Sequence, residues 1–387
     1  MKKRDLIIEN AKVVLPDRVL ESASIKIEDG IIADIQEGTF NNPKNRFDAS
    51  GYLVIPGFVD IHCDALEKEI EPRPNVLFPE DIALVELDKK LSACGITTIY
   101  HSVSFAEGEL GLRCNKTAKR IVEEIIRMKG NLNTRTMVHC RYEITNTEAL
   151  PIIEEMLKKG FIDLLSFMDH TPGQGQFRDI LSYKNFFGGV YGKSEEELMI
   201  LISRKFSVRN EAIENIFYLS SLCLKLGIPM ASHDDDSEEK IELIKNLEIR
   251  ISEFPVNKRA ARAARDKGIF VCVGAPNVLR GVSQVNNLSA REAISEGLAN
   301  ILCSDYSPMT FIHSIFKLYE LNILPLHEAI NMATLYPAQA VGISDRVGSI
   351  EVGKEADLII VDYKRNIKRI IKTFRAGIEV FSSCGIC

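Results

Sequence analysis

Long hydrophobic runs are absent from the sequence. The first apolar stretch, Leu6–Ile8, is soon broken by charged residues, which is not typical of a signal peptide. No run approaches the ~20 consecutive apolar residues that a membrane-spanning helix needs. We therefore expect a protein that has no membrane partner and lies in the cytoplasm.

A block of basic residues is also absent. The net charge is −6, and no local basic block compensates for it, which argues against a nucleic-acid-binding surface. A small anionic substrate is not excluded, because such a molecule responds to the charge of its pocket rather than to the total charge. We expect no nucleic-acid partner and keep an anionic small molecule as the expected ligand.

The cysteine pattern does not indicate a disulfide framework. The nine cysteines are an odd number scattered through predicted strands and helices, as is typical of a reduced cytoplasm. Only Cys384 and Cys387 form a C-x-x-C pair, at the end of the chain and without a second such pair. We interpret this pair as an exposed tail, with metal binding or redox cycling as the alternative.

The rhythm of apolar runs changes near residue 52. Residues 5–50 show short strands, with a hairpin signal at Asp29-Gly30, whereas strand-like and helical runs alternate afterwards. The strand-like runs cover 52–61, 97–102, 136–143, 163–168, 229–233, 248–251, 269–273 and 301–303. Eight strands alternating with helices predict an α/β protein with a (β/α)8 TIM-type barrel over 52–344. The segments 1–51 and 345–387 are then expected to form a small β-sandwich domain. A doubly wound open sheet is the alternative, although it would not place metal-type residues at nearly every strand end.

Side chains that can bind metal recur at the predicted C-terminal ends of these strands. His62 and Asp64, two residues apart at the end of a strand, point to the same face. An isolated H-x-D is more often a capped strand than a ligand pair, but five of the seven histidines fall at such ends. The residues are His62, Asp64, His101, His139, Glu143, Asp169, His170, His233, Glu253 and Asp305. Nitrogen and oxygen donors without thiolate suit one or two ions of Zn, Mn or Fe. We interpret His313 and His327, which fall in helical segments, as surface or packing residues.

Several motifs resemble those of a known family. The P-G-x-x-D-x-H motif from Pro56, the Ser304-Asp305 pair and the closing G-S-I-x-x-G-K-x-A-D-L-I-I-V-D from Gly348 resemble the amidohydrolase superfamily of metal-dependent barrels, over nearly the whole chain. Further matches are similar to the triphosphate diphosphatases of the carbon–phosphorus lyase pathway: 62–68 with 72–74, 168–174, 231–235, 274–277 and 304–306. Members of that family hydrolyse α-D-ribose 1-methylphosphonate 5-triphosphate to the 5-phosphate and pyrophosphate. The resemblance therefore implies a metal-dependent phosphoanhydride hydrolase.

The resemblance also implies roles for individual residues. The predicted metal ligands are His62, Asp64, Glu143, His170 and His233. Glu143 is the candidate bridging carboxylate, because strand four carries no lysine. Asp305 is the expected catalytic base, with Asp169 as the alternative. The residues expected to bind the substrate are Lys68, Arg73, His139, Arg141, Arg178, Asn277 and Arg280. The long glycine- and proline-containing stretch 171–194 is expected to be a functional loop.

Two other functions stay open from the sequence. The same constellation serves hydrolysis of a C–N bond, so a deaminase or deacetylase is the second interpretation. A non-catalytic barrel relative is the third; such relatives typically lose metal ligands, whereas this chain keeps candidates at six strand ends. A homodimer is a further expectation that the sequence does not test.

Overall fold

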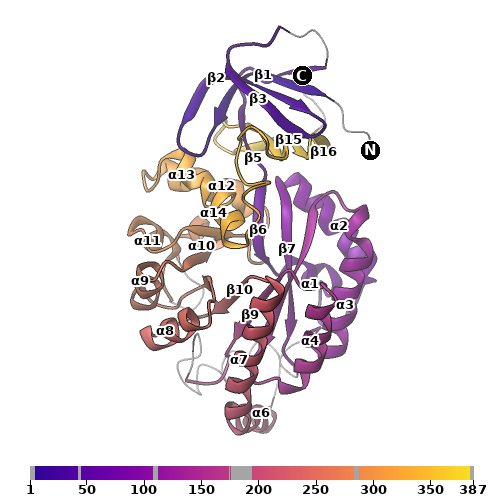
Figure 1. Cartoon of the computed structure of the whole chain (residues 1–387), viewed down its shortest axis with the longest axis vertical. Coiled ribbons are helices and arrows are strands. Elements are labelled where there is room, and N and C mark those ends of the chain that lie inside the picture. Colours follow the sequence, from indigo (N-terminus) through magenta and orange to yellow (C-terminus); the bar gives the residue numbers. More distant parts are fainter. Residues whose placement is uncertain are drawn as a thin grey trace.

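Two eight-stranded sheets make up the architecture. The computed structural model describes residues 5–41, 45–107, 112–173, 175, 194–282 and 287–383. In Figure 1 one sheet, built from both ends of the chain, lies above a larger body of strands and helices. The two sheets have separate buried clusters, so each has a core of its own.

Eight parallel strands of the larger sheet form a barrel. They are β6 (Phe58–Cys63), β7 (Ile96–Phe105), β8 (Arg135–Glu143), β9 (Leu164–Met168), β10 (Met230–His233), β11 (Ile251–Glu253), β12 (Phe270–Gly274) and β13 (Ile301–Cys303). The last strand returns to the first, because Cys63 and Asp305 form a parallel bridge. The backbone N–H of Asp64 donates to the oxygen of Asp305 at 2.7 Å, and that of Asp305 to His62 at 3.0 Å. The predicted (β/α)8 barrel is confirmed.

Helices surround the barrel strands (Figure 1). They are α1 (Ala65–Ile70), α2 (Glu80–Ala93), α3 (Asn115–Met128), α4 (Leu150–Lys158), α6 (Glu195–Ser207), α7 (Arg209–Leu226), α8 (Glu238–Asn246), α9 (Lys258–Asp266), α10 (Ala275–Arg280), α11 (Ala290–Ser295), α12 (Thr310–Glu320), α13 (Leu326–Asn331) and α14 (Leu335–Ala340). None of the helices in the described ranges is long and apolar enough to cross a membrane.

The helix α9 illustrates how local sequence sets these elements. Asn257 caps its start, because its side chain accepts the N–H of Ala260 at 2.9 Å. Ala260, Ala261 and Ala264 form its buried stripe at helical spacing, and charged residues occupy the other face. The chain leaves the helix through Gly268, whose φ of +72° favours glycine.

The terminal sheet pairs the two ends of the chain. Its strands are β1 (Leu6–Val14), β2 (Val19–Glu28), β3 (Ile31–Glu37), β4 (Arg46–Asp48), β5 (Leu53–Pro56), β14 (Leu358–Asp362), β15 (Arg369–Arg375) and β16 (Ile378–Ser382). N-terminal β5 runs antiparallel to C-terminal β14. The outer strand β3 bridges to Glu355 through Ile31, so the sheet curls around its own core. The predicted small β unit from both termini is therefore present.

One strand boundary differs from the prediction. The apolar run 52–61 is not a single barrel strand: β5 belongs to the terminal sheet and β6 to the barrel. The chain crosses between them at Gly57, whose N–H donates to Asp357 at 2.8 Å. A Cβ at Gly57 would lie only 2.3 Å from Thr97 Oγ1, so the crossing requires glycine. Continuous apolarity cannot reveal such a change of sheet.

Candidate metal centre

The C-terminal ends of the barrel strands lie away from the terminal sheet. Arg135, the first residue of β8, forms an ion pair with Asp357, which directly precedes β14. The terminal sheet therefore packs against the N-terminal ends of the strands (Figure 1). In barrels of this class, catalytic residues come from the opposite, C-terminal ends.

A first group of potential ligands joins β6, β8 and β11. His62, His139 and Glu253 offer ligand atoms that all lie within 4.8 Å of one another. Glu253 Oε1 is 2.9 Å from His62 Nδ1, and Glu253 Oε2 is 3.7 Å from His139 Nε2. Ser166 Oγ donates to Glu253 Oε2 at 2.7 Å. All these side chains are buried, so their ionisable atoms must find partners within the protein or in a ligand.

A second group follows β9 and β10. His170, His233 and Asp234 also offer ligand atoms within 4.8 Å of one another. Asp234 Oδ2 is 3.0 Å from His233 Nδ1 and 3.8 Å from His170 Nε2. Asp234 has a left-handed φ of +53° in the turn after β10. The ring centroids of His62 and His233 are 5.5 Å apart, so the two groups adjoin.

Arg141 connects a third group to the second. His62, Asp64 and Asp305 form this third group, in which His62 Nε2 is 3.7 Å from Asp64 Oδ1. Arg141 donates to both carboxylate oxygens of Asp64 at 3.0 Å and contacts His233 Nε2 at 3.2 Å. A positive charge thus lies in the middle of the acidic and imidazole side chains.

Glu143 contacts the second group from behind His170. Its Oε2 is 3.2 Å from His170 Nδ1 and accepts the backbone N–H of His170, also at 3.2 Å. Its Oε1 is 2.9 Å from Lys205 Nζ and accepts the Thr145 hydroxyl at 2.6 Å. Glu143 lies in none of the three groups found among the described residues. Its contacts are those of a carboxylate that orients a histidine.

Burial and neighbouring charges shift the protonation of the centre. Burial lowers the pKa of His139 to about 3. For Glu253, burial favours the neutral form, but His139 and His62 outweigh it and lower the pKa. Burial and the nearby Asp64 raise the pKa of Asp305 to about 6. Burial opposes ionisation of Asp64, yet Arg141 and His62 lower its pKa. The site therefore holds the ionised carboxylates of Asp64 and Glu253 next to Asp305, whose pKa is raised toward neutral pH.

The donor set fits a divalent transition metal. His139 Nε2 has no hydrogen-bond partner among the described residues, and the contact of Asp234 Oδ2 with His233 lacks hydrogen-bond geometry. Buried polar atoms are normally satisfied, so such atoms indicate a missing partner. Imidazole nitrogens and carboxylate oxygens suit Zn, Mn or Fe.

The structure places most of the residues expected from the sequence at this end of the barrel. His62, Asp64, His170, His233 and Asp305 fall into the groups of potential ligands, and His139, which was expected to bind substrate, is among them as well. Lys68 Nζ lies 4.9 Å from the centroid of the Tyr306 ring, beside Asp305.

The remaining expected substrate contacts are less central. Arg73 is exposed in the segment after α1, and Arg280 is exposed at the end of α10. Asn277 is half-buried in α10, directly after β12. Arg178 lies outside the described residues, as do Cys384 and Cys387. The assignments to Arg73, Asn277, Arg178 and Arg280 stay predictions.

His101 lies on β7 but not at its end. The strand continues to Phe105, and the neighbouring Ser102 contacts His139 Nδ1 at 3.3 Å inside the centre. Because side chains alternate along a strand, His101 points to the other face. Burial lowers its pKa to about 4, so it is a neutral packing residue.

Sequence reasoning missed three contributors to the centre. Glu253 has a side chain of a type that binds metal but is not among the predicted ligands, and Asp234 and Lys205 are absent from the prediction. Glu253 carried a signal, since a glutamate at the end of an apolar run is unusual. Lys205 carried none, because it lies on a helix 62 residues after Glu143.

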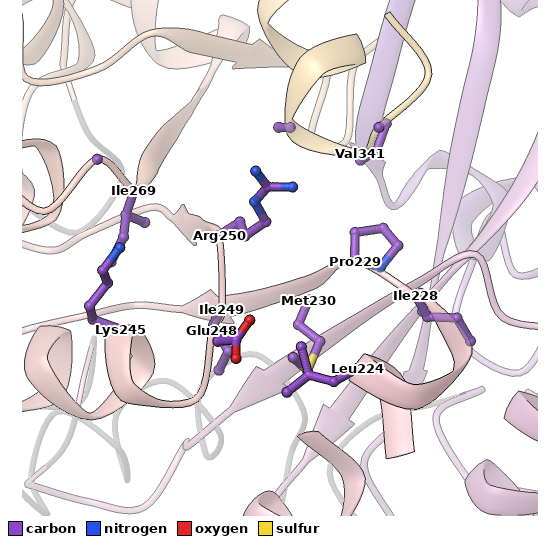
Figure 2. Close-up of a pocket in the computed structure, with 14 residues that line it drawn as sticks. Leu224, Ile228, Pro229, Met230, Lys245, Glu248, Ile249, Arg250, Ile269 and Val341 are labelled. Atoms are coloured by element: carbon purple, nitrogen blue, oxygen red, sulfur yellow. The ribbon is translucent and has the colours of Figure 1, made fainter. Parts of the chain in front are cut away.

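A separate cavity of about 510 Å³ lies at the other end of the barrel. Figure 2 shows Lys245, Glu248 and Arg250 around it, beside apolar residues such as Pro229 and Val341. These residues precede β10, β11 and β12 or follow α14. The groups of potential metal ligands do not extend to it within the described ranges.

Comparisons with known proteins agree with this architecture. The model of the amidohydrolase family matches residues 211–380. The chain is 33% identical to α-D-ribose 1-methylphosphonate 5-triphosphate diphosphatase of Escherichia coli (strain K12), over 97% of this chain and 100% of the relative. It is 25% identical to 5'-deoxyadenosine deaminase of Methanosarcina acetivorans, over 93% of this chain and 85% of the relative.

A solved structure shows the same fold. The crystal structure of dihydropyrimidinase from Brevibacillus agri NCHU1002 superposes with a TM-score of 0.68, covering 98% of this chain and 95% of that one, at 14% identity. That likeness supports the fold alone. The full-length relative and the matching family model show that the chain belongs to the amidohydrolase family of barrel hydrolases.

Proposed function

We propose that this protein is a metal-dependent hydrolase that cleaves α-D-ribose 1-methylphosphonate 5-triphosphate to the 5-phosphate and pyrophosphate. The observation that carries the proposal is the full-length relative with that activity in its name, at 33% identity. The centre supports it, because cations border its carboxylates. Arg141 contacts Asp64 directly, and Arg113 and Lys68 act on the pKa of Asp64 and Asp305 respectively. A triphosphate needs such local positive charge in a chain whose net charge is −6.

The residues that would hold the metal are those of the three groups. His62, His139 and Glu253 form one group, and His170, His233 and Asp234 a second. The third group shares His62 with the first and adds Asp64 and Asp305, so the arrangement allows one or two ions. When bound, a divalent ion favours deprotonation of water and draws electron density from a phosphoryl oxygen. Glu143 is proposed to orient His170 in this arrangement, in place of the bridging role expected from the sequence.

Asp305 is proposed to act as the general base. It follows β13, joins the third group, and has a pKa raised to about 6 by burial and by Asp64. A general base works best when its pKa is near the working pH, because much of it is then unprotonated and it still binds a proton strongly enough to remove one from water. Asp305 would accept a proton from the water that attacks the α-phosphorus. The bond from that phosphorus to the bridging oxygen then breaks, and pyrophosphate leaves.

Cationic side chains are proposed to stabilise the departing pyrophosphate. Lys68 lies close enough to Asp305 to lower its pKa, and Arg141 is buried among the carboxylates. Arginine suits this task because its planar fork binds two phosphate oxygens at once. Arg73, Asn277, Arg178 and Arg280 are kept as proposed contacts farther along the triphosphate.

Hydrolysis of a C–N bond is the second candidate function. The deaminase relative, at 25% identity over most of both chains, favours it. The same metal-and-base arrangement can attack a carbon centre, so the geometry of the ligands does not separate the two reactions. The positive charge near Asp64 and Asp305 favours the phosphate substrate, because an uncharged amide gains little from Arg113 beside Asp64 and Lys68 beside Asp305.

We also propose a cytoplasmic location. The seven cysteines of the described region are free thiols, as is usual in a reducing compartment. The homodimer expected from the sequence stays a prediction.

Phosphorus NMR of the products tests the function. Purified protein loaded with Zn, Mn or Fe is incubated with the ribosyl methylphosphonate triphosphate, and we expect equal amounts of the 5-phosphate and pyrophosphate. Parallel reactions with 5'-deoxyadenosine and with an uncharged cyclic amide serve as comparisons. Faster turnover of either of these than of the triphosphate would overturn the diphosphatase proposal in favour of C–N hydrolysis.

A further inference from the structure

Lys205 is a buried lysine whose position calls for an explanation. It lies near the end of α6 and is only 6% exposed. Lysine is almost never fully buried unless it is paired, because removing an ammonium group from water is costly. The neighbouring Arg204 shows the ordinary arrangement: it is 45% exposed and pairs with Glu148 on the surface.

The partner of Lys205 belongs to the metal centre. Lys205 Nζ is 2.9 Å from Glu143 Oε1 and donates to Thr145 Oγ1 at 3.2 Å. The Thr145 hydroxyl in turn donates to the same Glu143 oxygen at 2.6 Å. Two donors thus converge on Oε1, and this arrangement leaves Oε2 to face His170. The carboxylate cannot rotate without breaking both contacts.

The other oxygen of Glu143 controls His170. Oε2 is 3.2 Å from His170 Nδ1, while Nε2 of the same ring is 3.8 Å from Asp234 Oδ2 in the second group of potential ligands. A carboxylate that accepts the Nδ1 proton fixes the tautomer in which Nε2 carries the free lone pair. The orientation of Glu143 therefore decides whether His170 can serve as a ligand.

We propose that Lys205 is a positioning residue of the metal centre, which holds the Glu143 carboxylate so that His170 presents Nε2 to a divalent cation. The inference rests on the metal-binding part of the proposed function and is independent of the substrate. The ammonium group also keeps Glu143 ionised: burial opposes its charge, but Lys205 and His170 lower its pKa.

Zinc affinity in the absence of substrate tests the proposal. Lys205→Met removes the charge and keeps the length of the side chain, and we expect the dissociation constant for zinc, measured by competition with a chelator, to rise 10- to 100-fold. Lys159→Met is the matched control, because it breaks the exposed pair of Lys159, directly after α4, with Glu155, and it should change zinc affinity less than twofold. Circular dichroism and the melting temperature of the metal-free variants report on folding.

A double-mutant cycle separates positioning from general destabilisation. Glu143→Gln should weaken zinc binding at least as much as Lys205→Met, and the double variant should be no worse than Glu143→Gln alone. Additive losses would show that Lys205 acts independently of Glu143 and would overturn the proposal. A Lys205→Met protein that folds and binds zinc as the wild type does would overturn it as well.

If Lys205→Met does not fold, a variant with a smaller structural change can still test the proposal through zinc affinity. Thr145→Val removes the second donor to Glu143 Oε1 and one acceptor of Lys205, but it leaves the Lys205–Glu143 ion pair and the shape of the side chain in place. We expect a several-fold loss of zinc affinity with an unchanged melting temperature of the metal-free protein. Unchanged affinity in Thr145→Val, together with a non-folding Lys205→Met, would assign Lys205 to stability and overturn the proposal.

Discussion

The two ends of the barrel differ in whether their buried polar atoms have hydrogen-bond partners. At the N-terminal end, Arg135 lies 2.9 Å from Asp357 and also pairs with Glu355, while the backbone N–H of Ala376 donates to the other oxygen of Asp357. At the C-terminal end, His139 Nε2 has no hydrogen-bond partner among the described residues. Asp357 and His139 are both buried, but both carboxylate oxygens of Asp357 accept hydrogen bonds.

This difference distinguishes charged groups that stabilise the fold from those of the candidate metal centre. The Arg135 network joins the terminal sheet to the barrel, and its stability depends on every group having a partner. In the C-terminal cluster, His139 Nε2 lacks a hydrogen-bond partner among the described residues, and a bound metal ion would give that atom a partner. Burial alone would not distinguish the two ends; the pairing of individual atoms does.

Loss of a ligand should give the largest effect. We expect His62→Ala and His233→Ala each to abolish bound metal and turnover, beyond the 10- to 100-fold typical of residues that only support a ligand. The fold should persist, because the core clusters of apolar side chains are unchanged. Elemental analysis of protein purified without chelator, together with activity, checks this. Full metal content and activity in either variant would remove that histidine from the centre.

Breaking the satisfied network should cost stability instead. Arg135→Ala leaves the buried Asp357 without its cation, so we expect a loss on the order of 3 kcal/mol in the free energy of unfolding, measured with urea. Arg346→Ala is the control, because Arg346 also pairs with Glu355 but is 60% exposed, and it should cost less than about 1 kcal/mol. Metal content should stay normal in both. Equal losses would erase the distinction between buried and exposed partners of Glu355.

Removal of the base should slow the reaction without emptying the site. We expect Asp305→Asn to lower kcat by roughly 10²-fold or more, because the amide cannot accept the proton of the attacking water. Substrate binding should survive, since the change leaves the cationic contacts in place. Steady-state kinetics at saturating metal measures both. A rate near that of the wild type would move the base role to Asp169.

The cavity at the N-terminal end should be the least sensitive place. Arg250→Ala, at its centre in Figure 2, changes an exposed residue. We expect less than about 0.5 kcal/mol in stability and less than a twofold change in kcat/KM. Urea unfolding and kinetics measure these values. A tenfold loss of activity would show that function is not confined to the C-terminal end.

The prediction succeeded where local pattern and geometry coincide. Strand-like runs alternating with helices predicted the barrel. Parallel strands bring their carboxyl ends together, so His62, His170 and His233 were expected at one end of the barrel, and the structure places them there. It failed where register mattered. The predicted strand 248–251 is β11, Ile251–Glu253, and Glu248 instead has a left-handed φ of +57°. This shift places Glu253 inside the barrel, next to His62.

For Asp60, the sequence shows membership in a motif but not which atoms the side chain contacts. Asp60 belongs to the P-G-x-x-D-x-H motif, yet nothing in that pattern says what the aspartate does. In the structure its Oδ1 accepts the backbone N–H of Ser304 at 3.1 Å, which ties β6 to the chain just after β13. Burial raises the pKa of Asp60 to about 7. The motif thus combines a histidine of the candidate metal centre with a residue that closes the barrel.

The sequence by itself determined the fold class and the expectation that the candidate ligands share one end of the barrel, because hydrophobic periodicity sets the strands and parallel strands end at one face. Only the tertiary structure decided the partners of those residues. His62 and Glu253 are 191 positions apart, and Glu143 and Lys205 lie on a strand and a helix that approach through packing. Such contacts depend on strand register and helix placement, which many weak interactions set together and which no local pattern encodes.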